Sequence, residues 1–287
     1  MTNTTKVPNV KRDNRSLLQK YAAAPHIAWS VLFVLVPLVF VAYYAFTDAE
    51  GGFTFANVAK FFTATNLTIF FRSLKLAVIA TAICLLVGYP IAYAISRCKP
   101  KTQRAMILLL MVPMWMNFLI RTYAIMVLIQ DTGIINTFLG NFGIEPFHML
   151  GTEGAVVLGM VYDYLPYMIL PIYSVMTKID YRLVEAAGDL GCNSWGVMRK
   201  VIFPLSLSGV ISGVTMVLVP SISTFYISQK LGGEDTLMIG DLIEQNYYSG
   251  DYNMAASLSL VLMFILLVGL AIANRFSDGD EGGGMVL

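Results

Sequence analysis

Residues 185–204 read Glu-Ala-Ala-Gly-Asp-Leu-Gly-Cys-Asn-Ser-Trp-Gly-Val-Met-Arg-Lys-Val-Ile-Phe-Pro, and they lie between two long hydrophobic runs. Apolar residues at helical spacing lead up to Gly191, which is a natural end for a helix. A second short helix is expected from Ser194, an acceptable N-cap, to about Ile202. Pro204 then closes the unit and begins the next hydrophobic run. The stretch predicts two helices joined by a glycine-centred turn.

The first of these helices suits contact with another protein. Ala186 and Ala187 are small enough for a second surface to approach the backbone, and Glu185 offers an anionic end to a partner's cation. The alternative is an amphipathic helix that lies on lipid headgroups, which would favour bulkier apolar anchors. We therefore expect residues 181–204 to form a docking segment.

The composition indicates an integral membrane protein. Of 287 residues, 57% are hydrophobic and 13% are charged, and the mean hydropathy is +0.68. A soluble domain carries about 25% charged residues. No basic block indicates nucleic-acid binding, and we expect neither a metal nor a cofactor, because the cysteines and histidines have no ligand spacing: Cys84, Cys98, Cys192, His26 and His148.

Six segments are long and apolar enough to cross a bilayer, which takes about 20 residues in a helix. They are 26–46, 73–96, 105–130, 154–176, 207–230 and 254–274. The predicted fold class is an all-α integral membrane protein with six transmembrane helices. The predicted organisation is an N-terminal cytoplasmic segment (1–25), a six-helix membrane domain (26–276) and a flexible C-terminal tail (277–287).

Lysine and arginine predict the orientation, because they are enriched in short cytoplasmic connections. Segment 1–25 carries five of them, segment 97–104 carries four, and segment 177–206 carries four. The connections in between are poor in basic residues and rich in acidic ones. We therefore expect both termini and the docking segment on the cytoplasmic side, with an acidic outer face.

The spacing of the docking segment resembles a known motif. Glu185-Ala186-Ala187, three residues, Gly191, nine residues and then Val-Ile-Phe-Pro204 is similar to the EAA loop of ABC importer permeases, with apolar substitutions at two positions. The resemblance implies a type I ABC importer permease fold with cytoplasmic coupling helices. It also implies that Glu185, Ala186, Ala187, Gly191 and Pro204 dock a cytoplasmic ATP-binding subunit, present in two copies.

A narrower resemblance runs through residues 26–274. The motifs in 88–93, 112–123, 162–173 and 232–240 resemble the spermidine/putrescine permease group, above all its B-type subunit. This implies a bacterial inner-membrane transport subunit that imports polyamines by alternating access. It further implies a second, homologous permease subunit and an extracytoplasmic polyamine-binding protein. The chain has no G-x-x-x-x-G-K-[ST] loop, so ATP hydrolysis is expected from the partner and not from this chain.

Charges inside the apolar runs are candidates for the substrate path, because such charges are costly in a bilayer and usually paired or facing water. Asp163, with Tyr162 and Tyr164, offers a carboxylate and aromatic faces to ammonium groups. The alternatives are that Asp163 pairs with Arg121 structurally or meets water near a span end. Trp115 either lines the path or packs in the core.

Two further acidic residues, Asp241 and Glu244, lie three apart on an expected outer helix. They are candidates to meet an amine substrate or the binding protein, with simple solvation as the alternative. Together with the first group they make up the candidate substrate path.

Other functions remain open at this point. A permease for another small solute, such as an inorganic anion or an organophosphonate, would share much of the pattern. From a different class, an ion-driven secondary transporter would predict paired inverted repeats with broken helices. A membrane-embedded enzyme would favour clusters such as H-E-x-x-H, which the sequence lacks.

Overall fold

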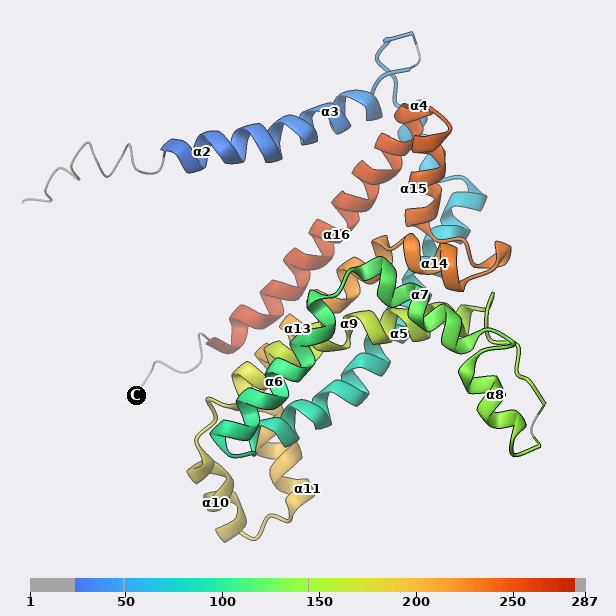
Figure 1. The fold of residues 1–287 in the computed structure, drawn as a ribbon. Coiled ribbons are helices and arrows are strands. Elements are labelled where there is room, and N and C mark those ends of the chain that lie inside the picture. Colours follow the sequence, from blue (N-terminus) through green and yellow to red (C-terminus); the bar gives the residue numbers. More distant parts are fainter. Residues whose placement is uncertain (1–23, 49, 144, 282–287) are drawn as a thin grey trace, which may run out of the picture.

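The computed structural model describes residues 24–48, 50–143 and 145–281, and these are helical almost throughout (Figure 1). Within these ranges, β-pairing is limited to two isolated bridges, Thr47 to Phe53 and Gly151 to Gly232. The all-α prediction is confirmed. The predicted segment 1–25 lies outside the described residues except for its last two.

The helices follow one another in a single series. The first half of the chain forms α2 (Ala24–Ser30), a π-helical turn (Val31–Leu35), α3 (Val36–Ala45), α4 (Ala56–Phe61), α5 (Ala64–Ser96), α6 (Pro100–Trp115), α7 (Phe118–Ile129) and α8 (Ile134–Gly140). The second half forms α9 (Glu153–Met176), α10 (Tyr181–Asp189), α11 (Ser194–Val197), a π-helical turn (Met198–Ile202), α12 (Phe203–Leu205), α13 (Leu207–Ser223), α14 (Tyr226–Leu231), a 3₁₀ turn (Glu234–Thr236), α15 (Ile239–Tyr248) and α16 (Tyr252–Glu281).

Five helical stretches of the described chain are long and apolar enough to cross a membrane, and a bent pair makes a sixth if it counts as one span. Four of them correspond to predicted spans: Pro25–Ala45, Ala64–Ser96, Glu153–Met176 and Tyr252–Ala273. The second begins nine residues before its predicted start at residue 73. The other two predicted spans need correction, since neither is one continuous helix.

The third predicted span, 105–130, is divided between α6 and α7. Pro113 lacks the N–H that would continue the helical ladder, and Met116 has an extended backbone (ψ 149°). The Asn117 side chain then caps α7 by accepting from the Leu119 N–H at 2.8 Å. The apolar candidate stretch consequently shifts to Phe118–Gly140.

The fifth predicted span, 207–230, stops at Ser223, and α14 begins separately at Tyr226. Hydroxyl side chains precede the break: Ser221 donates to the Val217 carbonyl at 2.6 Å, and Ser223 donates to the Val219 carbonyl at 3.3 Å. Such bonds compete with the helical backbone and bend helices. This region therefore forms a long helix and a short one.

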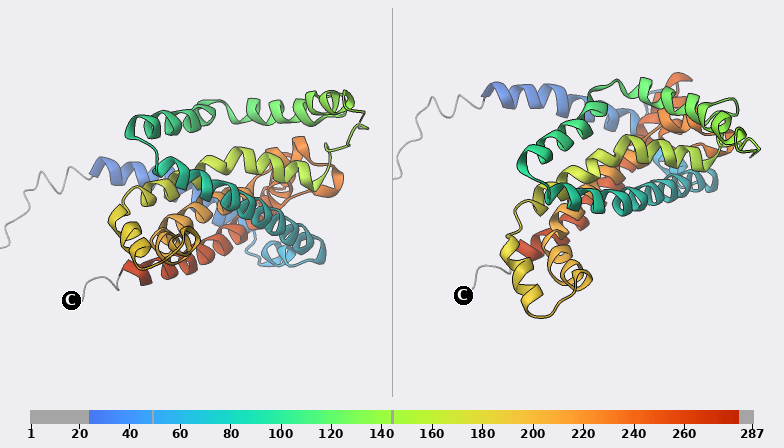
Figure 2. Two further views of the ribbon diagram at one scale, coloured as in Figure 1. Left: turned by 90° about the horizontal axis from the view of Figure 1, so that it is seen from below. Right: turned by 60° about the horizontal axis from the view of Figure 1, so that its bottom comes forward.

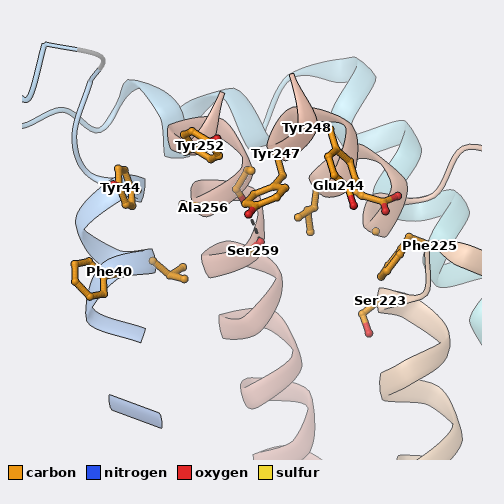
Figure 3. Close-up of a pocket in the computed structure, with 14 residues that line it drawn as sticks. Phe40, Tyr44, Ser223, Phe225, Glu244, Tyr247, Tyr248, Tyr252, Ala256 and Ser259 are labelled. Carbon is orange, nitrogen blue, oxygen red and sulfur yellow. Dashed lines mark hydrogen bonds between the residues drawn. The ribbon is translucent and has the colours of Figure 1, made fainter. Parts of the chain in front are cut away.

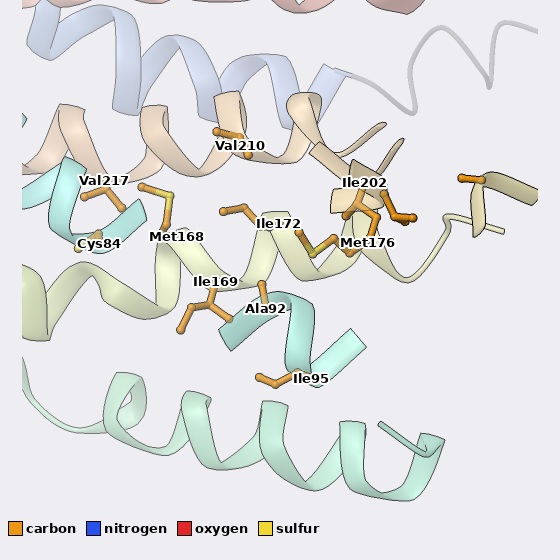
Figure 4. Packing of buried hydrophobic residues seen from close by; sticks show 12 residues of the cluster. Cys84, Ala92, Ile95, Met168, Ile169, Ile172, Met176, Ile202, Val210 and Val217 are labelled. Atoms are coloured by element: carbon orange, nitrogen blue, oxygen red, sulfur yellow. The ribbon is translucent and has the colours of Figure 1, made fainter. Parts of the chain in front are cut away.

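At the centre of the fold, α5, α9 and α13 pack against one another, and α6 and α7 lie along one flank of α9 (Figures 1 and 2). The core between the central helices is apolar and closely packed (Figure 4). Met168, Ile169 and Ile172 of α9 are fully buried within it. The largest helix contacts thus gather around α9.

Two glycines allow α13 to approach α9 closely. A Cβ added to Gly213 would lie 2.8 Å from the Met168 sulfur, and one added to Gly209 would lie 3.0 Å from the Pro171 carbonyl oxygen. Small residues at helix contacts are a common means of close packing in membranes, where backbones gain dispersion contacts by approaching. A larger side chain at either position would separate the helices.

The first span projects away from the central helices and touches α16 near its end (Figure 1). None of its apolar window is buried within the chain. At the other terminus, α16 continues to Glu281, because extension of an existing helix adds one hydrogen bond for each residue. Residues 282–287 lie outside the described part.

Candidate functional site

The predicted docking segment lies at one end of the helical bundle, where α10 and α11 extend beyond the central helices (Figures 1 and 2). Asp180 caps α10 by accepting from the Arg182 N–H at 3.0 Å. Gly191 follows the helix with a φ of +83°, a conformation that glycine adopts without strain. The predicted helix and its glycine end are therefore confirmed.

The second helix differs from its prediction in one respect. Asn193, and not Ser194, is the N-cap of α11: its side-chain oxygen accepts from the Gly196 N–H at 2.8 Å. Asparagine and serine are comparable caps, so the sequence alone does not separate them. The chain then continues through the turn Met198–Ile202 and through α12, which contains Pro204.

A sharp bend separates this segment from α13. The helices Ser194–Leu205 and Leu207–Ser223 meet at 67° around Ser206, which is fully buried. The Ser206 hydroxyl shares a hydrogen bond of 3.0 Å with the Tyr89 hydroxyl of α5. The bend is thus fixed to the central bundle.

One face of the docking segment is apolar and exposed. Leu190 is 86% exposed and Trp195 is 73% exposed. A groove of about 420 Å³ lies between α10 and α12, and it is lined by Leu183, Ala186, Ala187, Leu190, Lys200, Val201, Pro204 and Leu205. Glu185 is exposed on α10 but does not line the groove. This surface has room for a side chain of another protein, as exposed apolar patches often do.

The opposite face of the docking segment belongs to the central core. Val197 and Ile202 are buried in the same cluster as Ile172 and Met176 of α9, and Ala187, at the floor of the groove, belongs to this cluster as well. Figure 4 shows Ile202 beside Met176. A displacement of the segment is therefore transmitted to α9 through direct side-chain contact, since close-packed interiors deform little.

Arg97 was not among the predicted site residues, yet it joins the docking segment to α5. Its guanidinium lies 5.3 Å from the ring centroid of Tyr93 in α5 and 5.5 Å from that of Tyr181 in α10. Contacts of this kind between a cation and two aromatic faces hold both elements. A basic residue directly after a predicted span end is the sequence signal that points to it.

The two charges within the apolar runs are paired with each other. Arg121 of α7 and Asp163 of α9 lie 3.1 Å apart, from Nη1 to Oδ1, and their side chains are 7% and 1% exposed. The structure therefore contains the ion pair between Arg121 and Asp163 that the sequence analysis gave as an alternative. Asp163 accordingly faces the interior between helices in this conformation.

The aromatic candidates near Asp163 do not form one site. Tyr162 is 44% exposed, whereas Tyr164 is half-buried, with its ring centroid 6.4 Å from that of Tyr167. Trp115, at the end of α6, is 72% exposed, so it is not packed in the core of this chain. Tyr162 and Trp115 are available to a partner, to lipid or to a path between subunits.

Asp241 and Glu244 both belong to α15, at the opposite end of the bundle from α10 and α11 (Figure 1). Asp241 is 2% exposed, and its Oδ2 accepts from the Met238 N–H at 2.7 Å, which caps the helix. Burial raises the pKa of Asp241 to about 6, with a smaller contribution from the charge of Glu244. Simple solvation is excluded for Asp241 in this conformation.

Glu244 lines a separate pocket of about 700 Å³ between α3, α15, α16 and the end of α13 (Figure 3). Aromatic side chains provide most of its wall, namely Phe40, Tyr44, Phe225, Tyr247, Tyr248 and Tyr252. Glu244 accepts a hydrogen bond from the Gln229 side chain. The two carboxylates therefore serve two different cavities.

Comparison with known proteins agrees with this architecture. Residues 85–278 match the family described as "Binding-protein-dependent transport system inner membrane component". The spermidine/putrescine transport system permease protein PotB of Haemophilus influenzae is 37% identical over 261 residues, which cover 87% of this chain and 91% of that protein. The PotB protein of Escherichia coli is 32% identical and covers 88% and 94% of the two chains.

A solved structure shows the same fold. A chain of a bacterial ABC transporter that imports the acidic polysaccharide alginate superposes with a TM-score of 0.78 at 16% identity, over 92% of this chain and 96% of that one. The type I ABC importer permease fold is thus shown, with five or six candidate spans, and this chain belongs to the family of binding-protein-dependent transport system inner membrane components.

Proposed function

We propose that this chain is a membrane-spanning permease subunit of an ATP-driven importer that moves polyamines into the cytoplasm by alternating access. The observation that supports polyamines as the substrate is the similarity, over about nine-tenths of both chains, to proteins named as spermidine/putrescine permeases. The proposed location is the bacterial inner membrane, with both termini and the docking segment on the cytoplasmic side.

The proposed energy source is a separate ATP-binding subunit that seats on residues 185–204. The groove between α10 and α12 provides an apolar recess, and Glu185 provides an exposed charge elsewhere on α10. Because Ala187 and Ile202 share a buried cluster with α9, movement of this segment would shift the central helices. Two such ATP-binding subunits would serve two permease chains.

A second, homologous permease subunit is proposed to cover the first span. That span buries none of its apolar window within this chain, although Trp29 and Phe33 form an aromatic pair on it with centroids 4.2 Å apart. Membrane helices without neighbours in their own chain commonly pack against another subunit. The substrate path would then lie between the two subunits.

The chemistry around α15 fits an amine cargo delivered by an extracytoplasmic binding protein. Glu244 supplies a negative charge at a pocket with tyrosine and phenylalanine walls. Ammonium groups and methylene chains are both suited to such aromatic surroundings. Tyr162, Tyr164, Asp163 and Trp115 remain candidates for the path in other conformations.

The test is uptake by the importer reconstituted in vesicles, with this chain, its second permease, the ATP-binding subunit and the binding protein. Radiolabelled spermidine and putrescine are offered outside, and ATP or a non-hydrolysable analogue is enclosed. We expect the labelled polyamine to accumulate with ATP but not with the analogue, and excess unlabelled polyamine should reduce this accumulation.

The same vesicles separate the alternatives. Uptake of phosphate or an organophosphonate in place of polyamine would contradict the assignment of polyamine as the substrate. Polyamine uptake that follows an ion gradient and ignores ATP would overturn the transporter class.

A further inference from the structure

A second cavity lies on the other side of α15 from the aromatic pocket. Its volume is about 350 Å³, and it is lined by residues of α14, of the loop after it and of α15: Ser228, Gln229, Gly232, Gly233, Thr236, Leu237, Asp241 and Gln245. Ser228, Thr236 and Asp241 are each less than 5% exposed and form its inner wall. Gln229 and Gln245 are exposed and lie at its mouth.

The inner wall presents hydrogen-bond acceptors. The Ser228 hydroxyl donates its proton to the Phe225 carbonyl at 2.8 Å, and the Thr236 hydroxyl donates to the Gly233 carbonyl at 2.7 Å. Each hydroxyl therefore keeps only lone pairs for the cavity. Asp241, when ionised, accepts and does not donate. Such a lining favours a donor with positive charge.

One carboxylate oxygen in this wall lacks a partner. Asp241 Oδ2 accepts from the Met238 N–H, and the Ser228 and Gln229 side chains lie near the carboxylate, but within residues 24–48, 50–143 and 145–281 no donor has hydrogen-bond geometry to Oδ1. Buried polar atoms are hydrogen-bonded in the great majority of cases, so an exception calls for a ligand or a function. Burial raises the pKa of Asp241, and hydrogen bonding from Met238, Ser228 and Gln229 offsets this rise only in part.

The donor set is suited to an ammonium group better than to a metal ion. Across the described chain, no group of three or more histidine, cysteine or acidic residues is placed to hold a metal. One carboxylate with neutral oxygens around it matches a single positive charge that carries three N–H donors. The cavity is also several times larger than the roughly 30 Å³ of one water molecule.

We propose that this cavity binds one primary ammonium group of the polyamine, with Asp241 Oδ1 as its counter-ion and the Ser228 and Thr236 hydroxyls as further acceptors. This inference rests on the proposed function, since it names the place where that cargo meets the chain. Gln229 connects the cavity to the aromatic pocket, because it lines the one and bonds to Glu244 in the other. The methylene chain of the cargo leaves the cavity at the glutamine-lined mouth.

The experiment is equilibrium binding of labelled putrescine to the purified complex of both permeases and the ATP-binding subunits, without the binding protein. Binding is compared with that of 4-aminobutanol, in which a hydroxyl replaces one ammonium group. The wild type should prefer putrescine at least tenfold. Asp241→Asn should reduce this preference to twofold or less, because the second ammonium loses its counter-ion.

The Asp241→Asn variant is expected to fold, since an asparagine oxygen can still accept a hydrogen bond from the Met238 N–H. Asp235→Asn is the matched control: it removes the same charge from an exposed side chain in the same region and should keep the wild-type preference. A tenfold preference retained by Asp241→Asn would overturn the inference. So would a wild-type complex that imports polyamine but shows no preference between the two compounds.

A failure of the proposed function has a different signature. The wild-type importer would then show no ATP-dependent polyamine uptake even with its binding protein. Uptake in the wild type therefore separates the two conclusions before the variants are compared.

Discussion

Arg121 and Asp163 form a buried ion pair that joins α7 to α9, with Nη1 and Oδ1 3.1 Å apart. Both side chains are withdrawn from solvent, so each charge depends on the other for compensation. The pair fixes α7, which follows the break at Asn117, against the most buried helix of the bundle.

Removal of one member of this pair should therefore destabilise the fold. Asp163→Asn or Arg121→Gln leaves an isolated buried charge or an unfilled partner, at a cost of about 3–5 kcal/mol. We expect a lower unfolding temperature in detergent and less assembled complex for either single variant. The measurement is thermal unfolding followed by size-exclusion chromatography.

The double variant Arg121→Gln/Asp163→Asn is the control for this prediction. It removes both charges and should recover most of the lost stability. If Asp163→Asn assembled normally and lost only polyamine uptake, a role in the path would replace the structural one.

Reversal of charge at the docking segment should separate the chain from its ATP-binding subunit. Glu185→Lys places a cation on the exposed surface of α10, where a partner's cation is expected. The amount of ATP-binding subunit that co-purifies should fall at least tenfold. Asp235→Lys makes the same reversal at the other end of the bundle and should leave co-purification unchanged; equal retention by both variants would contradict the docking role of Glu185.

Enlargement of Gly213 should disrupt the contact between α13 and α9. A leucine there would collide with Met168, since even a Cβ would lie 2.8 Å from its sulfur. Overpacking of a core typically costs about 1–3 kcal/mol. Gly269→Leu in α16 meets no neighbour within 4 Å and is the matched control. Gly213→Leu should unfold at a lower temperature than Gly269→Leu. Similar unfolding temperatures would mean that α13 and α9 accommodate the larger side chain without loss of stability.

Polyamine handling should depend on pH near the pKa of Asp241, which burial raises to about 6. Ammonium binding needs the ionised carboxylate, so putrescine affinity should fall as pH is lowered through about 6. Glu244, on the same helix, is the charged neighbour that contributes to this pKa, while α14 contributes the uncharged Ser228 and Gln229. Asp241→Asn should remove most of the pH dependence between pH 5 and 7.

The same shift affects stability with a defined sign. Since the pKa of the folded state lies above the ordinary value of about 3.9, the folded state takes up a proton between about pH 4 and 6. Its stabilising contribution is present below about pH 4 and is lost as pH rises through about 6. Asp241→Asn should therefore unfold at a higher temperature than the wild type at pH 7.5 but not at pH 4.

The sequence predicted the parts of this molecule that depend on local pattern. Hydropathy located four spans closely, and glycine at position 191 indicated the turn that its φ of +83° confirms. The spacing from Glu185 to Pro204 predicted the helix–turn–helix form of this segment because that pattern is continuous in the chain, and its docking role stays a prediction.

Features that depend on tertiary contact were beyond such reasoning. The ion pair at Asp163 was one of several alternatives, since its partner lies on another helix. The sequence placed Asp241 and Glu244 together, but packing of α14 against α15 sends them to separate cavities. The break at Asn117 was missed because an apolar run conceals a cap inside it.

The 67° bend at Ser206 joins the long helix α13 to the shorter helical stretch Ser194–Leu205. Helix α13 has 17 residues and a length of about 25 Å at 1.5 Å per residue. A swing of about 10° around the bend would carry its far end through an arc of about 4 Å, by the same helical geometry. That end carries Ser223 and leads to Phe225, both on the wall of the aromatic pocket (Figure 3). A rotation of that size, if the packing of α13 on α9 allowed it, would change the width of the aromatic pocket at the end of the protein distant from α10.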